Sequence, residues 1–337
     1  MSQLHTYIVI GSGSIARRHI ANLKLLFPKA SVGCVSASGR ELSLDETGAD
    51  SVYSDFPSAM EAKPVFVVVA SPAPFHVDHA TYWVSAGIPV LVEKPLSSSY
   101  ELFRKTGAVL RTNSHKIGVA YNLRHLNSAK RLQTLLAEKI IGRVHTVLVD
   151  VGQYLPDWRP ATDYRKNVSA QRALGGGVLL ELSHELDYLT WLFGEFDTAY
   201  CVATNSGVLE IDVEDRVDAI LVRKDGLVAN LHMDFLQRKT TRVCKIVGEE
   251  GTLLWDLTQN NITLRTGFEG DNILFSDPDY DRNCMYLDEL DHFSKVAAGI
   301  AEPLVSIEHA LYVLRLVDAL KYSSTTRLTV NIGEFES

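Results

Sequence analysis

The segment Gly11-Ser12-Gly13-Ser14-Ile15-Ala16 decides the fold of the N-terminal part of the chain. It directly follows a short apolar run, Tyr7–Ile10, and it opens an amphipathic stretch, Ser14–Phe27. An apolar run, a glycine-rich turn and an amphipathic stretch in this order predict a strand, a tight turn and a helix. This strand–turn–helix context gives weight to a glycine pattern that would be weak evidence alone.

The residue types in this turn suit the binding of a dinucleotide. Gly11 permits the tight turn, and Gly13 lets the backbone approach a pyrophosphate. A small residue at Ala16 allows the strand and the helix to pack closely. The helix N-terminus, with Ser14 and Ile15 in its first turn, offers unpaired N–H groups to phosphate oxygens.

The residues that follow the second predicted strand set the selectivity for the cofactor ribose. An NAD site carries Asp or Glu there, which accepts hydrogen bonds from the ribose hydroxyls. This chain has Ser36, Ser38 and Arg40 instead. Two hydroxyls and a guanidinium suit a 2′-phosphate, so the sequence predicts NADP(H) in preference to NAD(H). In the alternative, Arg40 points to water and Glu41 or Asp45 serves the ribose.

The first third of the chain alternates strands with helices. Its apolar runs are short and apolar on successive residues, as in parallel strands that helices cover on both faces. The predicted strands are Tyr7–Ile10, Val32–Val35, Val65–Ala70, Val90–Val92 and Ile117–Ala120. The predicted helices are Ser14–Phe27, Phe75–Ala86 and Tyr100–Arg111, the last with Ser98 and Glu101 at capping-box spacing. This alternation predicts a Rossmann-type, doubly wound α/β domain over residues 1–122.

A second, α+β domain is predicted over residues 123–337. Its strand-like runs between Asp197 and Arg265 are joined by short turns, and consecutive strands joined in this way pair antiparallel. The sequence therefore predicts an open, mainly antiparallel sheet with helices on one face. The other predicted elements are a strand at Val144–Tyr154 and helices at Asn127–Glu138, Val178–Phe193, Met285–Ala298 and Ile307–Tyr322.

Composition narrows the function classes. A chain of 337 residues exceeds the size at which a single hydrophobic core keeps growing, so we expect two domains. A net charge of −8 without a long basic run argues against nucleic acid as a partner. The four cysteines are far apart, and the histidines and the loop around Asp279 lack the spacing of a metal site. We see neither a signal peptide nor an apolar stretch of about 18 residues, and we expect a cytoplasmic protein without membrane contact.

Three further motifs follow the dinucleotide-binding turn along the chain. They are Ser71-Pro72-Ala73-Pro74-Phe75-His76, Glu93-Lys94-Pro95 and a glycine triplet at 175–177 that opens a helix. With these motifs nearly the whole chain resembles the glucose–fructose oxidoreductase / inositol dehydrogenase / rhizopine catabolism (Gfo/Idh/MocA) family. The resemblance implies an NAD(P)-dependent oxidoreductase that transfers hydride between the nicotinamide and a hydroxyl or keto carbon of a sugar.

The resemblance also implies roles around the fifth strand. Lys94 would lie beside the nicotinamide, hydrogen-bond the reacting hydroxyl and stabilise the developing alkoxide. Pro95 in the family usually follows a cis peptide bond. The remaining residues that we expect at the cofactor are Ser71, Pro72, His76 and Glu93.

A proton-transfer residue is expected in the helix after the glycine triplet. Family members commonly carry Asp-x-x-x-His there, whereas in this chain His184 comes one residue early and Glu185 occupies the usual histidine position. His184 keeps the family's spacing to Asp187, which places both on one helical face. Either the helix begins differently and His184 transfers the proton, which its pKa favours, or Glu185 does. In a third interpretation His184 is a core histidine satisfied by Asp187.

Substrate residues are expected at the domain junction and in the following aromatic loop. The pair Asn122 and Arg124 resembles the family's Asn-x-Arg segment. The loop mixes arginines with aromatic rings, which suits an anionic sugar or a nucleotide sugar; it could equally form a polar lid or a subunit contact. Its candidate residues are Tyr154, Trp158, Arg159, Tyr164 and Arg165.

Two other functions remain open at this point. Some relatives keep NAD permanently bound and use it transiently to cleave glycosidic bonds, and a non-catalytic dinucleotide-binding sensor is also consistent with the motifs. Relatives usually associate through the open face of the second domain's sheet, which implies a homodimer or homotetramer. A shared fold does not identify the substrate.

Overall fold

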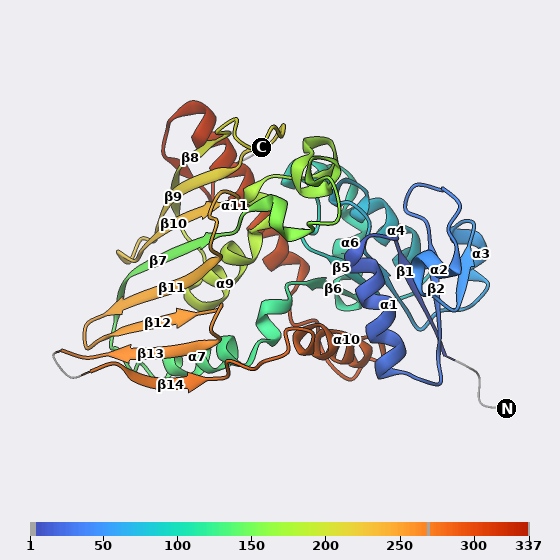
Figure 1. The fold of residues 1–337 in the computed structure, drawn as a ribbon, viewed down its shortest axis with the longest axis horizontal. Helices are drawn as coiled ribbons and strands as arrows, with labels where there is room; N and C mark the ends of the chain where they lie inside the picture. The colour runs from blue at the N-terminus through green and yellow to red at the C-terminus, as the bar shows by residue number, and fades with distance from the viewer. Residues whose placement is uncertain (1–4, 268–269, 336–337) are drawn as a thin grey trace. The chain divides into compact units, whose positions relative to one another are not determined.

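The computed structural model describes residues 5–267 and 270–335 and consists of two compact units (Figure 1). The first unit runs to Asn122 and takes in Arg282–Leu314. The second comprises Leu123–Asp281 and the chain from Arg315 onward. The sequence-based domain boundaries, 1–122 and 123–337, stay predictions, and in the structure Arg282–Leu314 packs with the first unit.

The first unit contains a six-stranded parallel sheet with the strand order β3-β2-β1-β4-β5-β6. The strands are β1 Thr6–Ile10, β2 Ser31–Val35, β3 Ser51–Tyr53, β4 Phe66–Val69, β5 Val90–Glu93 and β6 Ile117–Ala120. The order reverses between β1 and β4, and ligands of doubly wound sheets bind outside the carboxyl ends of the strands at such a point. The predicted Rossmann-type sheet is confirmed.

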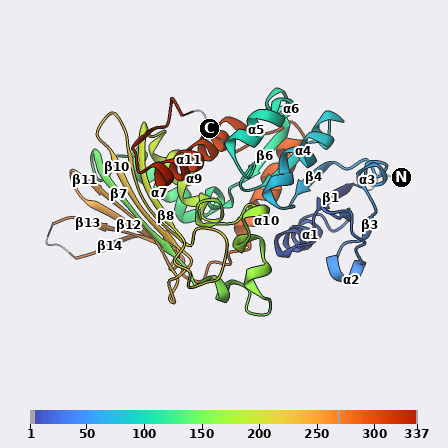
Figure 2. The same cartoon turned by 90° about the horizontal axis from the view of Figure 1, so that it is seen from above.

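Helices cover both faces of this sheet. Figures 1 and 2 show α1 and α10 on one side and α4 and α6 on the other. The helices are α1 Ser14–Leu26, α2 Leu44–Thr47, α3 Phe56–Met60, α4 His76–Ser85, α5 Tyr100–Thr106, α6 Ala108–Thr112 and α10 Cys284–Ala297, with 3₁₀ turns η1 Ala73–Phe75 and η2 Ser114–Lys116. The predicted helix Tyr100–Arg111 is divided at Gly107, and its N-cap is Ser99, whose hydroxyl accepts the N–H of Leu102 at 3.1 Å, rather than Ser98.

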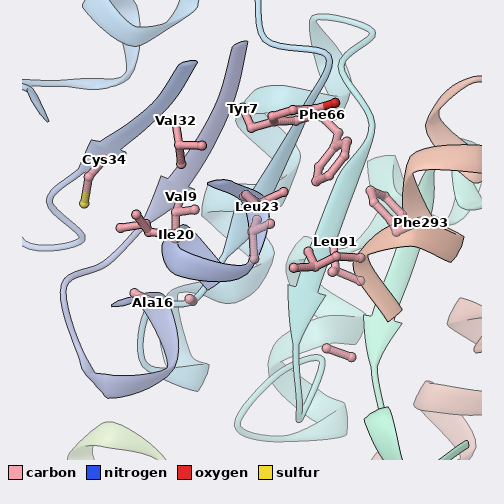
Figure 3. Packing of buried hydrophobic residues seen from close by; sticks show 14 of the residues in the cluster. Tyr7, Val9, Ala16, Ile20, Leu23, Val32, Cys34, Phe66, Leu91 and Phe293 are labelled. Carbon is pink, nitrogen blue, oxygen red and sulfur yellow. The ribbon is translucent and has the colours of Figure 1, made fainter. Parts of the chain in front are cut away.

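The core of the first unit explains why the chain returns to it. The ring of Phe66 on β4 lies between Tyr7 on β1 and Phe293 on α10, with centroid distances of 4.8 and 5.2 Å (Figure 3). Leu290 and Val296 of α10 are buried in the same cluster. The apolar face of α10 therefore covers the strands of the first unit, and residues distant in sequence complete its core.

The second unit is built on a nine-stranded sheet with the order β14-β13-β12-β11-β7-β10-β9-β8-β15. The strands are β7 Val144–Gly152, β8 Thr198–Thr204, β9 Arg216–Val222, β10 Val228–Asp234, β11 Thr241–Gly248, β12 Thr252–Asp256, β13 Asn261–Arg265, β14 Asn272–Ser276 and β15 Val330–Asn331. Neighbouring strands are antiparallel except β7 and β10, which are parallel. The predicted, mainly antiparallel sheet is confirmed.

One face of the nine-stranded sheet is covered and the other is open. Along β9 the side chains alternate, with Val217 and Ala219 buried while Asp218 and Ile220 are exposed. Figure 2 shows α7 and α9 on the covered face. The helices other than those that cover the six-stranded sheet are α7 Asn127–Ala137, α8 Val178–Glu181, α9 Ser183–Phe193 and α11 Ile307–Thr326, with 3₁₀ turns η3 Asn122–His125, η4 Leu155–Trp158, η5 Tyr164–Lys166, η6 Val168–Ala170 and η7 Arg172–Leu174.

Within residues 5–267 and 270–335, no helix has both the length and the apolar character that crossing a membrane requires.

Candidate active site

The turn between β1 and α1 has the geometry that a pyrophosphate requires. Gly11 has a φ of +114°, and a Cβ added to it would lie 2.6 Å from the carbonyl oxygen of Ala70, so only glycine fits. A Cβ added to Gly13 would meet no protein atom within 4 Å. Gly13 is also the N-cap of α1 and makes no side-chain cap hydrogen bond. The open space and the unpaired N–H groups of α1 fit the pyrophosphate of a dinucleotide.

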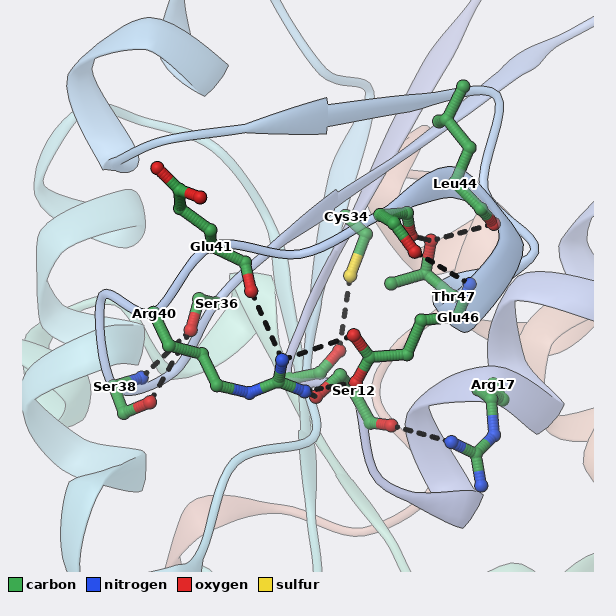
Figure 4. Close-up of polar contacts among 12 residues, drawn as sticks. Ser12, Arg17, Cys34, Ser36, Ser38, Arg40, Glu41, Leu44, Glu46 and Thr47 are labelled. Carbon is green, nitrogen blue, oxygen red and sulfur yellow. Dashed lines mark hydrogen bonds and ion pairs between the residues drawn. The ribbon is translucent and has the colours of Figure 1, made fainter.

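The loop after β2 holds an ion pair that the sequence did not reveal (Figure 4). The Nη1 of Arg40 donates to Glu46 Oε2 at 3.1 Å, and its Nη2 contacts Glu46 Oε1 and donates to Ser12 Oγ at 2.8 Å. The hydrogen bond from Arg40 lowers the pKa of Glu46. The predicted preference for NADP rested on this guanidinium together with Ser36 and Ser38; the structure shows the guanidinium paired with Glu46, and the preference stays a prediction.

Lys94 follows β5 directly, and its backbone N–H is bound by Glu93, which forms a buried pair with His19. Oε1 of Glu93 lies 2.7 Å from Nε2 of His19, and Oε2 accepts the backbone N–H of Lys94 at 3.2 Å. His19 and Glu93 are both buried. The peptide bond before Pro95 is cis, as the resemblance implied. Both carboxylate oxygens of Glu93 thus have partners inside the first unit, and its expected contact with the cofactor stays a prediction.

His76 connects the segment after β4 with the segment after β5. Its Nε2 lies 2.6 Å from the carbonyl oxygen of Ser71, and its Nδ1 lies 2.8 Å from that of Pro95. The side chain is buried, and burial lowers the pKa of His76. Both ring nitrogens of His76 thus contact backbone carbonyl oxygens, and the expected contact of His76 with the nicotinamide stays a prediction. The expected contacts of Ser71 and Pro72 with the nicotinamide stay predictions.

In the second unit, Arg124 is engaged by Asp187. Its Nη2 donates to Asp187 Oδ1 at 2.7 Å, and its Nε donates to Oδ2 at 3.1 Å. Both side chains are buried, and the guanidinium carbon lies 5.2 Å from the centre of the Trp191 ring. The guanidinium of Arg124, which was expected at the substrate, is thus already paired with a carboxylate, and its contact with substrate stays a prediction. Asn122, at the end of the first unit, is likewise buried.

The helix after the glycine triplet begins differently from the continuous helix that was predicted. The chain leaves the helical conformation at Leu182, and α9 starts at Ser183. Glu185 then points into the interior, fully buried, and its two oxygens accept from Nε and Nη2 of Arg242 at 2.7 and 3.1 Å. His184 is partly exposed. This arrangement favours His184 over Glu185 as the proton-transfer residue, because a fully buried, ion-paired carboxylate is a poor proton acceptor for substrate.

The aromatic loop is held by contacts within the second unit. Tyr164 donates its hydroxyl to the carbonyl oxygen of Leu209 at 3.0 Å, and Trp158 donates Nε1 to the carbonyl oxygen of Gln153 at 3.3 Å. The guanidinium of Arg238, which sequence reasoning missed, lies 3.7 Å from the centre of the Tyr154 ring. The aromatic residues therefore have structural partners of their own.

The loop arginines differ in their surroundings. Arg165 donates Nε to Asp163 Oδ1 at 3.0 Å and Nη1 to Glu210 Oε2 at 2.9 Å. These two carboxylates hold the pKa of Arg165 above its ordinary value. Arg159 is exposed. Arg165 was expected to bind an anionic substrate, and two carboxylates already compensate its charge.

A parallel sheet with a phosphate-accepting turn at its switch point, joined to an α+β unit, defines a two-unit oxidoreductase of the NAD-binding Rossmann class. The chain belongs to the Gfo/Idh/MocA family. Residues 5–121 match the family model described as "Oxidoreductase family, NAD-binding Rossmann fold", and residues 129–254 match the model of the "GFO/IDH/MocA C-terminal domain". The resemblance inferred from the motifs is confirmed.

Curated relatives include several sugar and polyol oxidoreductases. The chain is 28% identical over 155 residues to the rhizopine catabolism protein MocA of Rhizobium meliloti, a match that covers 46% of each chain. It is 27% identical over 260 residues to the 1,5-anhydro-D-fructose reductase of Ensifer adhaerens, covering 74% of each. An inositol 2-dehydrogenase of Streptomyces avermitilis is 29% identical over 209 residues, 60% of this chain and 57% of that one. The match thus spans less than half of MocA.

Solved structures share the fold over almost the whole chain. A levoglucosan dehydrogenase in complex with NADH superposes with a TM-score of 0.84 at 19% identity, covering 98% of this chain and 99% of that chain. The WlbA dehydrogenase of Bordetella pertussis, in complex with NADH and UDP-GlcNAcA, has a TM-score of 0.80 at 19% identity, covering 97% and 98%. At this identity the likeness establishes the fold.

Proposed function

We propose that this protein is a nicotinamide-dinucleotide-dependent dehydrogenase or reductase of a sugar or cyclic polyol. The observation that carries the proposal is the coexistence, in one unit, of an open phosphate-accepting turn at Gly13 and of Lys94 at the carboxyl end of β5. Doubly wound sheets bind their cofactors at this edge, and Lys94 supplies a cation for a developing alkoxide. The membership of the family supports the same conclusion.

The dinucleotide, when bound, supplies the acceptor or donor of hydride. The ammonium of Lys94 donates a hydrogen bond to the reacting oxygen and stabilises its negative charge during hydride transfer. Glu93 holds the backbone N–H of Lys94, at 3.2 Å, and thereby positions this residue. His184 accepts the hydroxyl proton in oxidation and returns it in reduction.

A neutral substrate is the version of this proposal that we favour. Arg165, one of the two loop arginines on which the expectation of an anionic substrate rested, is paired with Asp163 and Glu210. Arg124, the expected substrate arginine outside the loop, is paired with Asp187. A second anion would have to displace these partners or share them, which weakens its binding. Several relatives are named as enzymes of levoglucosan, inositol or 1,5-anhydro-D-fructose, and all three compounds are uncharged.

An anionic sugar or a nucleotide sugar is the second candidate. The exposed Arg159 is the feature of the chain that favours it. A structural neighbour, WlbA, was solved with UDP-GlcNAcA, which shows that this fold accommodates a nucleotide sugar in that protein. Substitution of Arg159 by Ala would raise the KM for an anionic sugar without changing that for a neutral one.

The test is a substrate screen followed by absorbance of the reduced nicotinamide. Neutral sugars and inositols, uronic acids and nucleotide sugars are each offered with NAD and with NADP. We expect turnover with a neutral compound and a loss of about 10³-fold in kcat for Lys94→Met. Lys105→Met is the matched control, since Lys105 lies on the exposed side of α5 in an ion pair with Glu101.

Two outcomes would contradict this proposal and favour its alternatives. Release of free sugar from a glycoside, by protein that carries a bound dinucleotide and shows no net cofactor turnover, would identify a glycosidase. Tight dinucleotide binding without turnover of any compound, and with Lys94→Met binding equally well, would favour a sensor. The predicted cytoplasmic location stays a prediction in each case.

Association through the open face of the nine-stranded sheet is part of the proposal. This face holds a depression of about 710 Å³, lined among others by Leu148, Val202, Ile220 and Leu254. Leu148 and Ile220 are large apolar side chains that expose 38% and 44% of their surface. A second copy would remove this apolar area from water. Analytical ultracentrifugation of Ile220→Lys, with the surface variant Leu25→Lys as control, tests whether the oligomer dissociates.

A further inference from the structure

We propose that Glu46 sets the cofactor selectivity of this protein and makes it selective for NAD(H). In this inference the Glu46 carboxylate holds Arg40 away from a 2′-phosphate and accepts the ribose hydroxyl that NAD carries at the same position. The inference rests on the proposed function, because it concerns the adenosine half of the same cofactor. It reverses the preference that the sequence of this loop predicts.

Both terminal nitrogens of the Arg40 guanidinium contact the carboxylate of Glu46. Nη1 donates to Oε2 of Glu46 at 3.1 Å while Nη2 contacts Oε1, which is the two-pronged arrangement that arginine also uses to bind phosphate. A 2′-phosphate would therefore compete with Glu46 for the same donors. It would also bring about two negative charges next to a carboxylate, and like charges at this separation repel.

The pair is anchored to the phosphate-binding turn itself. Arg40 Nη2 donates to the hydroxyl of Ser12 at 2.8 Å, and Arg17 on α1 donates to the Ser12 carbonyl oxygen at 3.1 Å (Figure 4). Because the adenosine ribose is bonded to the pyrophosphate, groups fixed to this turn are within its reach. The side chains of Arg40 and Glu46 remain 49% and 35% exposed, so a ligand can approach them.

Glu46 is held in place independently of Arg40. Its backbone N–H is accepted by the hydroxyl of Ser43, the N-cap of α2, at 3.1 Å. This hydrogen bond fixes the backbone from which the Glu46 carboxylate extends. Accepting a ribose hydroxyl is the role that an acidic residue after β2 plays in NAD sites. Glu41, one of the two acidic residues considered from the sequence, contacts Arg40 through its backbone carbonyl, at 3.1 Å.

This difference makes Glu41→Gln a matched control for Glu46→Gln. Dissociation constants for NADH and NADPH are measured by fluorescence titration at constant ionic strength for the wild type, both variants and Glu46→Gln combined with Arg40→Ala. We expect the wild type to bind NADH at least about tenfold more tightly than NADPH. Glu46→Gln should shift the ratio of the two constants toward NADPH by about tenfold or more, and the double variant should lose that gain in NADPH affinity. Glu41→Gln should leave the ratio unchanged.

The outcomes separate the inference from the function on which it rests. A wild type that prefers NADPH, or a ratio that Glu46→Gln leaves unchanged while both cofactors bind, overturns the inference alone. Absence of binding of either cofactor to the folded wild type contradicts the proposed function as well. Circular dichroism of each variant establishes that a lost affinity does not come from unfolding.

Discussion

The imidazole of His19 and the carboxylate of Glu93 lie 2.7 Å apart in the interior of the first unit. His19 belongs to α1, the helix that begins at the phosphate-binding turn, and Glu93 is the last residue of β5. The second oxygen of Glu93 accepts the N–H of Lys94. One buried hydrogen-bonded chain therefore connects the helix that would bind the cofactor with the residue that would polarise the substrate.

Replacement of His19 by Ala should reduce both stability and turnover. It leaves a buried carboxylate without this partner, which costs about 1–3 kcal/mol in the free energy of unfolding. A less constrained Glu93 also holds Lys94 less firmly, so kcat should fall while the KM for substrate changes little. Urea unfolding and steady-state kinetics measure the two effects. His19→Asn, which keeps a hydrogen-bond donor, should restore part of each, and full activity of His19→Ala would show that the pair does not position Lys94.

The return of α10 to the first unit gives a second prediction. Phe293 is buried against Phe66, and its ring is shown facing that residue in Figure 3. Phe293→Ala should lower the free energy of unfolding by about 3–5 kcal/mol, because it leaves a cavity in the core. Ile300→Ala, close in sequence but 77% exposed, should change it by less than about 0.5 kcal/mol. Equal effects of the two substitutions would show that α10 does not complete this core.

The parts of the fold that local patterns encode could be predicted from the sequence. The turn at Gly11 and Gly13, the strands that flank it and the helix from Ser14 follow from residue types within a short window. The place of α10 could not be predicted in this way, because its amphipathic pattern shows that one face is buried but not against which sheet. The three-residue strand β3 escaped the prediction because it is too short to show a period.

The candidate site was predictable in its residue types but not in its pairings. The sequence identifies Arg40, Arg124 and Arg165 as cations, and nothing in it shows that each meets a carboxylate. Glu46, Asp187 and Glu210 lie 6, 63 and 45 positions away from these arginines in the chain, so the folded chain brings each pair together; Arg165 also pairs with Asp163, two positions away. The directions in which His184 and Glu185 point depend on the break in the helix at Leu182. No glycine or proline stands at this position to indicate the break from the sequence.

The roles of His184 and Glu185 can be separated by comparing stability with turnover. Glu185→Ala removes one partner of a buried ion pair with Arg242 and should cost about 3–5 kcal/mol in the free energy of unfolding. His184→Asn should change that free energy by less than about 1 kcal/mol but reduce kcat by about 10²–10⁴-fold. Urea unfolding and kinetics at a temperature where all variants are folded make the comparison. A folded Glu185→Gln with a loss of kcat as large as that of His184→Asn would return the proton-transfer role to Glu185.

His232 on the open face of the nine-stranded sheet lies between two aspartates. Its Nδ1 is 2.7 Å from Asp218 Oδ1, and its Nε2 is 2.9 Å from Asp234 Oδ2. Burial alone lowers the pKa of His232, but the hydrogen bonds and charges of both aspartates outweigh it and raise the pKa above its ordinary value of 6.5. Gln237 bridges Asp234 to Asp150, at 2.8 and 3.0 Å, and so keeps a third carboxylate nearby.

Stability should therefore decrease with rising pH in a way that depends on His232. A raised pKa means that the folded protein holds this proton more tightly than the unfolded chain does. The resulting stabilisation is complete below about pH 6.5 and is lost as the pH rises through the folded-state pKa. The free energy of unfolding of the wild type relative to His232→Gln should accordingly be largest near about pH 6 and smallest near about pH 9. Urea unfolding at a fixed protein concentration measures it, with the exposed His115→Gln as control. A difference between wild type and His232→Gln that stays constant over this range would contradict the raised pKa, since only a proton bound more tightly in the folded state gives the difference a pH dependence.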